Sequence, residues 1–250
     1  KMKILFLGDI VGDSGFKSVK NSLPNIISTK KIDFVCVNGE NAAAEGVGLT
    51  ENIASELYNA GVDVITTGNH VWDQKEIFDF IETENKLLRP INMNGNLPGS
   101  GFSVFNSKKN MKVGVLNLMG NVFMKKCDDV FKIASEFITK KKKFKDYNFL
   151  IVDFHGETTS EKMAIGNLFD GYATLVVGTH THVPTNDARV LKNGTAYITD
   201  AGMCGDYDSV IGMDEKNSLN RFLKKESTKH FPANGEASIS GVIVECDVKN

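Results

Sequence analysis

Two histidines separated by a single residue follow an apolar run in the second half of the chain. The run covers residues 173–177, and the sequence GTHTH at 178–182 contains His180 and His182. A β-branched run that stops at a glycine is typical of a buried strand, so we expect both histidines at its end, beside a cleft. Residues two apart in extended backbone point to the same side, about 6.5–7 Å apart, which suits two imidazoles flanking metal ions about 3.5–4 Å apart. An isolated H-x-H sequence is more often an ordinary pair of histidines, so this interpretation depends on the rest of the chain.

Four other apolar runs also end at polar side chains that can bind metal ions. These runs cover 3–7, 33–37, 62–67 and 149–154. With the two histidines above, the side chains that follow the runs are Asp9, Glu40, Asn41, Asn69, His70, His155, His180 and His182. Each has an ordinary explanation of its own, such as capping of a turn or burial in a core. Because ligands bind beyond the carboxyl ends of the strands in α/β sheets, we expect the whole set to meet at one edge. Of the five histidines, only His230 falls outside this set.

The types of these side chains predict the chemistry of the site. Oxygen and imidazole donors without thiolates suit manganese, iron, zinc or similar divalent ions. Two such ions carry four positive charges, of which Asp9 and Glu40 neutralise two, so about one remains after a bridging hydroxide. A site with this charge attracts a phosphate ester and stabilises the negative charge of its transition state. A metal-bound water is the expected nucleophile, so the chemistry requires no serine or cysteine nucleophile.

The elements that must position this site alternate between strands and helices in the first half of the chain. Helices are predicted over 16–28, 50–60, 73–83, 128–143 and 160–169, and further strands over 87–91, 101–105, 111–118, 196–199 and 241–245. Thr50 and Asp73 are predicted to cap the second and third helices, and Pro24 to kink or break the first. Early β-α-β alternation followed by strand-rich sequence predicts an α/β fold in layers with some antiparallel pairing. The absence of repeats and low-complexity linkers favours a single domain over 1–250.

Composition excludes several classes of function. The net charge of −2 offers no general attraction to nucleic acid or to an anionic membrane, and no direct nucleic-acid-binding motif is present. No apolar run approaches the roughly 20 residues of a membrane span, and no signal-peptide pattern opens the chain. The four cysteines are scattered without a C-x-x-C pair. We therefore expect a cytoplasmic protein with reduced thiols and no membrane partner.

The candidate ligands lie within longer motifs that resemble a known family. These motifs are GDIVG at 8–12, NGENA at 38–42, GNHVWD at 68–73, DFH at 153–155, TTSEK at 158–162, GTHTH at 178–182 and TAYITD at 195–200. Their order resembles that of the calcineurin-like metallophosphoesterases. The similarity is greater to the bacterial YmdB-like phosphodiesterases, and it covers nearly the whole chain. Val11 replaces the histidine of the broad superfamily's first motif, and Glu40 replaces its bridging aspartate. Both differences fit the YmdB-like subgroup.

The resemblance implies a fold, a cofactor and a reaction. The implied fold is an α/β four-layer sandwich, in which two mixed β-sheets are flanked by helices. The implied cofactor is a pair of divalent metal ions, iron or manganese foremost, with zinc or magnesium as alternatives. The implied reaction is hydrolysis of a small phosphodiester, with 2′,3′-cyclic nucleotides as the substrate class. Homo-oligomers are implied as well.

The resemblance also implies a role for each residue. Asp9, Asn41 and His182 would hold one metal ion, and Asn69, His155 and His180 the other, with Glu40 bridging them. His70 would act on the scissile phosphate or the leaving oxygen. The ordinary pKa of an imidazole lies near neutral pH, which suits a general acid. The alternative is that His70 only binds the phosphate or orients a neighbour. Glu157 and Glu161 are candidate partners of the ligand histidines, although Glu161 equally suits the start of a helix.

Two other functions remain open from the sequence. A phosphomonoesterase or a nuclease could use the same metal centre, because the metals treat the phosphoryl group alike and the rim selects the substrate. A regulatory or RNA-associated protein could retain the centre for sensing a ligand. Salt-sensitive RNA binding that persists after metal removal would identify that second alternative.

Overall fold

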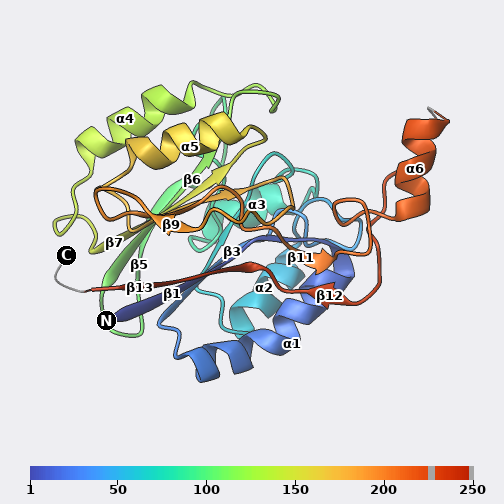
Figure 1. The fold of residues 1–250 in the computed structure, drawn as a ribbon, viewed down its shortest axis with the longest axis horizontal. Helices are drawn as coiled ribbons and strands as arrows, with labels where there is room; N and C mark the ends of the chain where they lie inside the picture. Colours follow the sequence, from blue (N-terminus) through green and yellow to red (C-terminus); the bar gives the residue numbers. More distant parts are fainter. Residues whose placement is uncertain (225–228, 248–250) are drawn as a thin grey trace.

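The computed structural model describes residues 1–224 and 229–247, and within them the strands form three sheets (Figure 1). The first sheet has the order β13-β1-β3-β4, with β13 Gly241–Cys246, β1 Met2–Leu7, β3 Phe34–Asn38 and β4 Val64–Thr66. The second has the order β5-β6-β7-β8-β10-β9, with β5 Phe102–Asn106, β6 Lys112–Met119, β7 Phe149–His155, β8 Leu175–Thr179, β10 Ala196–Ile198 and β9 Arg189–Val190. A small third sheet joins β12 Ala237–Ser238, β11 Met203–Asp206 and β2 Asp9–Ile10. In the two large sheets the inner strands are parallel, whereas β13, β5 and β9 pair antiparallel.

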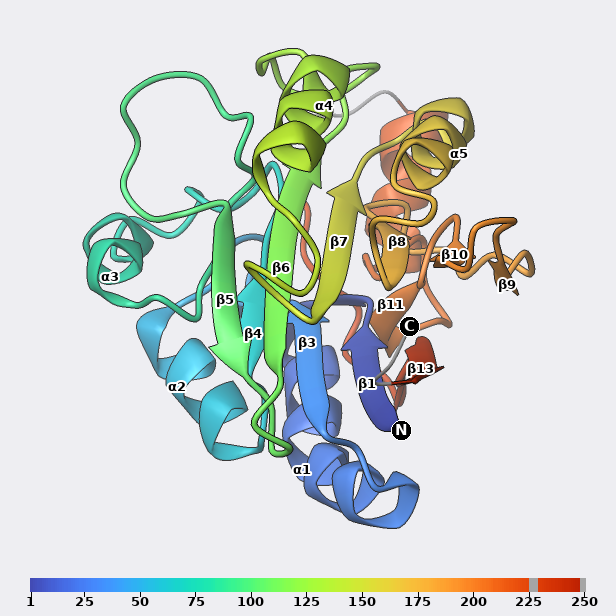
Figure 2. The same ribbon diagram turned by 90° about the vertical axis from the view of Figure 1, so that its left-hand side faces the viewer.

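Helices cover the outer faces of the two large sheets (Figures 1 and 2). The helices over the first sheet are α1 Gly12–Lys30, α2 Glu51–Asn59 and α3 Ile77–Thr83, and those over the second are α4 Val130–Lys140 and α5 Thr159–Leu168. Helix α6 Glu215–Leu223 projects from this body (Figure 1). The predicted four-layer α/β sandwich is confirmed.

Strand β1 shows why the chain forms this sandwich. Ile4 and Phe6 pack between the two sheets, whereas Leu5 and Leu7 pack against the helices over the first sheet. Alternate residues of a strand point to opposite faces, so a strand that is apolar at every position is covered on both faces. Burial on both faces therefore holds the inner strands of both sheets in place. It also sets where their carboxyl ends lie, at one edge of the sheets.

Most predicted elements are present, with two corrections. Thr50 caps α2, because its hydroxyl accepts the Ile53 N–H at 3.2 Å. Helix α3 begins at Ile77 rather than at the predicted cap Asp73, whose carboxylate instead contacts the ring of His70. The predicted strand over 87–91 is reduced to two isolated bridges. Pro90 lacks the N–H that a longer ladder would need.

Several short elements were not predicted. The two-residue strands β2, β9 and β12 form only where the tertiary fold brings their partners together, and β11 is scarcely longer. Pro24 lies inside α1, which is longer than predicted.

Among the described residues, no helix is long and apolar enough to cross a membrane.

Candidate metal centre

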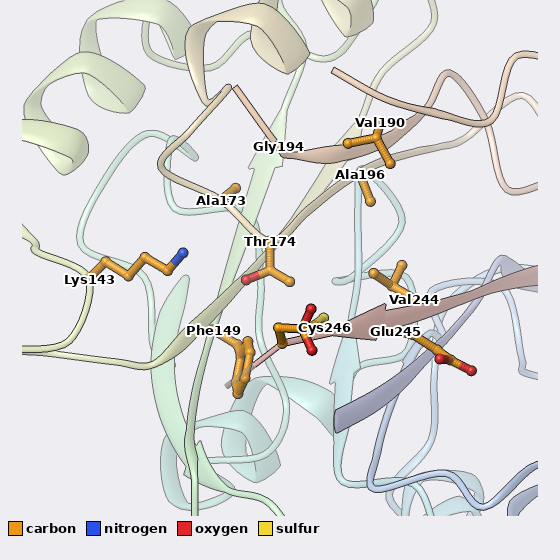
Figure 3. A pocket seen from close by; sticks show the side chains of 11 residues that line it. Lys143, Phe149, Ala173, Thr174, Val190, Gly194, Ala196, Val244, Glu245 and Cys246 are labelled. Carbon is orange, nitrogen blue, oxygen red and sulfur yellow. The ribbon is translucent and has the colours of Figure 1, made fainter. Parts of the chain in front are cut away.

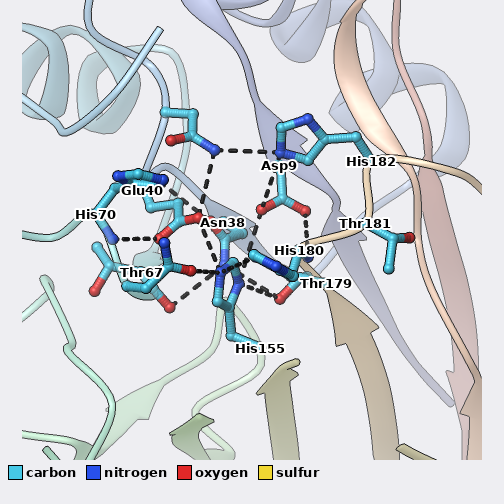
Figure 4. A network of polar contacts seen from close by, with 12 residues as sticks. Asp9, Asn38, Glu40, Thr67, His70, His155, Thr179, His180, Thr181 and His182 are labelled. Atoms are coloured by element: carbon cyan, nitrogen blue, oxygen red, sulfur yellow. Dashed lines mark hydrogen bonds and ion pairs between the residues drawn. The ribbon is translucent and has the colours of Figure 1, made fainter. Parts of the chain in front are cut away.

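The eight side chains singled out in the sequence lie together at the carboxyl ends of strands from both large sheets (Figure 4). Asp9 follows β1, Glu40 and Asn41 follow β3, Asn69 and His70 follow β4, His155 ends β7, and His180 and His182 follow β8. Asp9, Glu40 and His155 are fully buried, and the ring of His70 is 32% exposed. A buried cluster of carboxylates, amides and imidazoles is costly unless its members are paired or bind a cation.

One half of the cluster is centred on the ring of His155. Its Nε2 lies 2.9 Å from Glu40 Oε1, 3.0 Å from Asn69 Oδ1 and 3.1 Å from His180 Nδ1. Ligand atoms of Glu40, His155 and His180 all lie within 4.8 Å of one another. Three donors from three strand ends therefore converge on one point.

The other half of the cluster surrounds His182. Its Nε2 lies 3.2 Å from Asn41 Nδ2 and 3.9 Å from Asp9 Oδ1. The Asn41 amide also donates to Glu40 Oε1 at 3.4 Å. Glu40 thus stands between the two halves and contacts a member of each.

The electrostatics of the cluster favour a cation. Burial raises the pKa of Glu40, but the adjacent His155 outweighs it and lowers that pKa to about 2. Burial lowers the pKa of His155, but Glu40 and Asp9 outweigh it and raise that pKa to about 9. Burial and the nearby His155 lower the pKa of His180 to about 3. The buried carboxylates therefore favour positive charge at the point where the histidines meet.

Two unpaired oxygens indicate that this cation is a metal ion. Asp9 Oδ1 and Asn41 Oδ1 are buried and accept no hydrogen bond from the described residues. Leaving a buried acceptor unsatisfied costs about 1–3 kcal/mol. Both oxygens belong to the half of the cluster that contains His182. Hard oxygen donors beside imidazoles fit a divalent ion of the manganese, iron or zinc type.

Hydrogen bonds on the far side of the His155 ring select the nitrogen that faces the cluster. His155 Nδ1 lies 2.9 Å from Thr179 Oγ1, and this hydroxyl donates to Asp153 Oδ1 at 2.7 Å. A hydroxyl has one proton, so Thr179 accepts the Nδ1–H of His155. Nδ1 therefore keeps its proton, and Nε2, which faces Glu40, is the nitrogen that can give up its proton to bind a metal ion.

The other two histidines are oriented in the same manner. His182 Nδ1 donates to the Ile211 carbonyl at 2.7 Å, and His180 Nε2 lies 3.1 Å from Glu157 Oε2. The ring nitrogens without such an orienting partner are His182 Nε2 and His180 Nδ1, and both face the cluster. Such bonds fix the tautomer of a metal-binding histidine. Glu161, the other predicted partner, instead accepts backbone N–H groups of the 121–122 turn.

The backbone of the two-histidine sequence differs from the prediction. Strand β8 ends at Thr179, and His180 and His182 have φ angles of 97° and 65°. The predicted extended H-x-H arrangement is therefore wrong. The two rings reach different halves of the cluster because the chain bends between them.

A cavity of about 360 Å³ opens beside the cluster. Glu40, His70, His180 and His182 line one side of it, and Val47, Ile211, Met213 and His230 line much of the rest. His230 was set apart in the sequence because it follows no apolar run. No local sequence pattern predicts this position of His230, since only the tertiary fold brings it to the wall of the cavity.

A second cavity lies near the opposite ends of β7 and β8 and is ill suited to catalysis (Figure 3). It measures about 180 Å³, and its lining includes Lys143, Phe149, Thr174 and Cys246. Burial raises the pKa of the Cys246 thiol to about 11. A thiol that stays protonated at neutral pH is a poor nucleophile.

Comparison with known proteins agrees with this geometry. Over 246 residues the chain is 46% identical to the 2′,3′-cyclic-nucleotide 2′-phosphodiesterase of Bacillus subtilis, covering 98% of this chain and 92% of that protein. A crystal structure of a novel phosphatase from Mycoplasma pneumoniae superposes with a TM-score of 0.91 at 40% identity, covering 99% of this chain and 89% of that one. A hypothetical protein from Thermus thermophilus gives a TM-score of 0.88 at 37% identity, covering 97% of this chain and 99% of that one.

The sandwich and these similarities define the class of the protein. It is a hydrolytic enzyme of the phosphodiesterase and phosphatase class, as the ligand residues predicted. The chain belongs to the YmdB-like protein family, whose model matches residues 5–250. The predicted membership is confirmed.

Proposed function

We propose that the chain hydrolyses phosphodiesters, with 2′,3′-cyclic nucleotides as its substrate class, at a centre of two divalent metal ions. The observation that carries this proposal is the convergence of ring nitrogens of three histidines on buried carboxylate and amide oxygens, two of which accept no hydrogen bond from the described residues. The name of the Bacillus subtilis relative supports the substrate class.

The two halves of the cluster would hold one ion each. Asp9, Asn41 and His182 would hold the first, and Asn69, His155 and His180 the second, with Glu40 as the residue shared between them. The contacts of Glu40 with His155 at 2.9 Å and with Asn41 at 3.4 Å support the bridging role. When bound, the ions supply positive charge for the phosphoryl oxygens and activate the attacking water. The donors favour iron or manganese, with zinc or magnesium as alternatives.

His70 is proposed as the general acid for the leaving oxygen. Its Nδ1 lies 2.6 Å from Asp73 Oδ2, and its backbone N–H donates to Glu40 Oε2 at 3.1 Å. Its ring lines the cavity rather than the buried cluster. Asp73 orients the ring through Nδ1, and Nε2 is the nitrogen that would deliver a proton to the departing alkoxide.

The shape of the cavity supports a nucleotide rather than a bare phosphate. The polar side next to His70 and His180 would hold the phosphodiester, and the wall of Val47, Ile211 and Met213 offers apolar contact to a base. A methionine adapts its shape to a flat ring. A volume of about 360 Å³ is within the range of small-molecule sites.

The test is a substrate panel on protein of known metal content. Bis(p-nitrophenyl) phosphate is compared with p-nitrophenyl phosphate, and 2′,3′-cyclic AMP with 3′,5′-cyclic AMP. We expect the diester to exceed the monoester in kcat/KM, and the 2′,3′-cyclic nucleotide to exceed its isomer. Preference for the monoester would make phosphomonoesterase the better description, and no turnover at full metal content would refute the proposal.

The proposal includes a homo-oligomer in the cytoplasm. Helix α6 projects from the body and exposes Leu219, Phe222 and Leu223, a surface that a second copy could cover (Figure 1). All four cysteines are free thiols, which suits a reducing compartment. Light scattering of the purified chain, compared with a variant carrying Phe222→Ser, tests the oligomer. A monomeric wild-type chain would contradict it.

A further inference from the structure

A buried ion pair lies behind the two-histidine sequence, defined here as the 180–182 segment. Lys162 of α5 is 1% exposed, and its Nζ donates to Asp200 Oδ2 at 2.6 Å and to the Thr179 carbonyl at 2.9 Å. The Asp200 side chain is equally buried. A buried ion pair seldom stabilises a fold more than apolar residues of similar size. Stability of the core therefore does not account for this pair.

The carboxylate of Asp200 contacts the backbone that carries three candidate ligands. Its Oδ2 accepts the Thr181 hydroxyl at 2.7 Å and the Thr181 N–H at 3.2 Å. Its Oδ1 accepts the Gly202 N–H at 2.8 Å, and the Gly202 carbonyl accepts the Asp9 N–H at 3.1 Å. Thr181 is the middle residue of the 180–182 segment. The buried carboxylate of Asp200 thus connects the 180–182 segment to Gly202, whose carbonyl holds the backbone of Asp9.

The 180–182 segment needs such a restraint because its backbone is unfavourable. His180 and His182 have positive φ angles, which are unfavourable for a residue with a side chain. Extended backbone would relieve this cost and would turn both rings to one side of the strand. The hydrogen bonds from Thr181 to Asp200 oppose that relaxation. They keep the bend that sends the two rings to different halves of the cluster.

We propose that Lys162, Asp200 and Thr181 are positioning residues of the metal centre, which hold the 180–182 segment in its bent backbone so that each histidine meets its own ion. Lys162 acts through Asp200, because its Nζ donates to Oδ2 at 2.6 Å and so holds the carboxylate in place beside Thr181. The inference rests on the proposed two-metal function. It assigns these three residues no contact with substrate.

The test measures metal binding by the apo protein. Thr181→Val removes the hydroxyl at nearly constant shape, and Thr181→Ser retains it. Mn²⁺ is titrated into each apo protein by calorimetry. We expect Thr181→Val to weaken Mn²⁺ binding about tenfold and Thr181→Ser to restore it, and Lys162→Met to weaken it by about 10–100-fold. Ile165→Ala is the matched control, because it removes buried apolar volume from α5 without touching Asp200.

Hydrogen exchange of the metal-free proteins measures how firmly the 180–182 segment is held, independently of metal binding. The Thr181 amide, which donates to Asp200, is expected to exchange at least about tenfold faster in Lys162→Met, and at the wild-type rate in Ile165→Ala. Wild-type Mn²⁺ affinity in both Thr181→Val and Lys162→Met would overturn the inference, as would an equal loss in Ile165→Ala. If the wild type binds none of Mn²⁺, Fe²⁺, Zn²⁺ and Mg²⁺, the two-metal function fails, and the exchange rates alone decide whether the segment is held as described.

Discussion

The ligand histidines are positioned by two different means. His155 is the last residue of a regular parallel strand, and its ring is oriented by Thr179 and Asp153 from the adjoining strand and its own. His180 and His182 lie beyond the end of β8, in backbone with positive φ. The geometry of the sheet places His155, whereas the placement of His180 and His182 depends on hydrogen bonds to distant residues. Variants at His155 should therefore act directly on ligation, and variants around the 180–182 segment should act through its conformation.

The largest combined effect, on metal content as well as on turnover, is expected from His155→Ala. It removes the ring on which Glu40, Asn69 and His180 converge. The protein should retain one equivalent of metal instead of two, and kcat should fall by about a thousandfold. Metal analysis and turnover of bis(p-nitrophenyl) phosphate measure the two effects. His230→Ala, at the cavity wall, is the control that should keep both metals. Full metal content in His155→Ala would contradict the ligand assignment.

His70→Ala should separate ligation from chemistry. The ring contacts Asp73 and lines the cavity but is not among the ligand atoms that converge. The variant should keep its metal and lose about 10²–10⁴-fold in kcat, the usual contribution of a general acid. Asp73→Asn should cost less, because the ring itself remains. Turnover of His70→Ala at the wild-type rate would remove His70 from the mechanism.

The contrast between His155 and the 180–182 segment also explains what the sequence could predict. Apolar runs that end at polar side chains predicted the positions of Asp9, Glu40 and His155. A buried strand is visible in the local sequence, and in α/β sheets ligands bind beyond the carboxyl ends of the strands. The bend at His180 could not be predicted, since it depends on Asp200. Nothing in the spacing of the two residues indicates this contact.

Two further misses have the same origin. Asp73 has the spacing of a helix cap and also that of a partner for His70, and the tertiary fold selected the second. His230 reaches the cavity wall from a segment without any strand signal. Local patterns therefore predict which residues a sheet delivers to its edge. They do not predict which residues the loops add to it.

Asp153→Asn tests the orientation of the His155 ring. The carboxylate accepts from Thr179 Oγ1, whereas an amide can donate to this oxygen. Thr179 would then donate to His155 Nδ1, and the ring proton would move to the nitrogen that faces the cluster. We expect metal affinity to fall by about 10–100-fold. Asp63→Asn, which alters a carboxylate bonded to the Val35 N–H, is the control and should bind metal normally.

The smallest effect is expected from Glu157→Gln, which alters the corresponding partner of His180. The Glu157 side chain is 49% exposed, so solvent screens its charge toward His180. A glutamine oxygen still accepts the Nε2–H of His180, and the tautomer is preserved. Metal affinity should change by less than about fivefold. Calorimetry of Glu157→Gln and of Asp153→Asn under the same conditions therefore measures how far burial of the hydrogen-bond partner strengthens its control of a ligand histidine. If the exposed variant lost as much affinity as the buried one, His180 would owe its position to Glu157 as well as to the hydrogen bonds that bend the 180–182 segment.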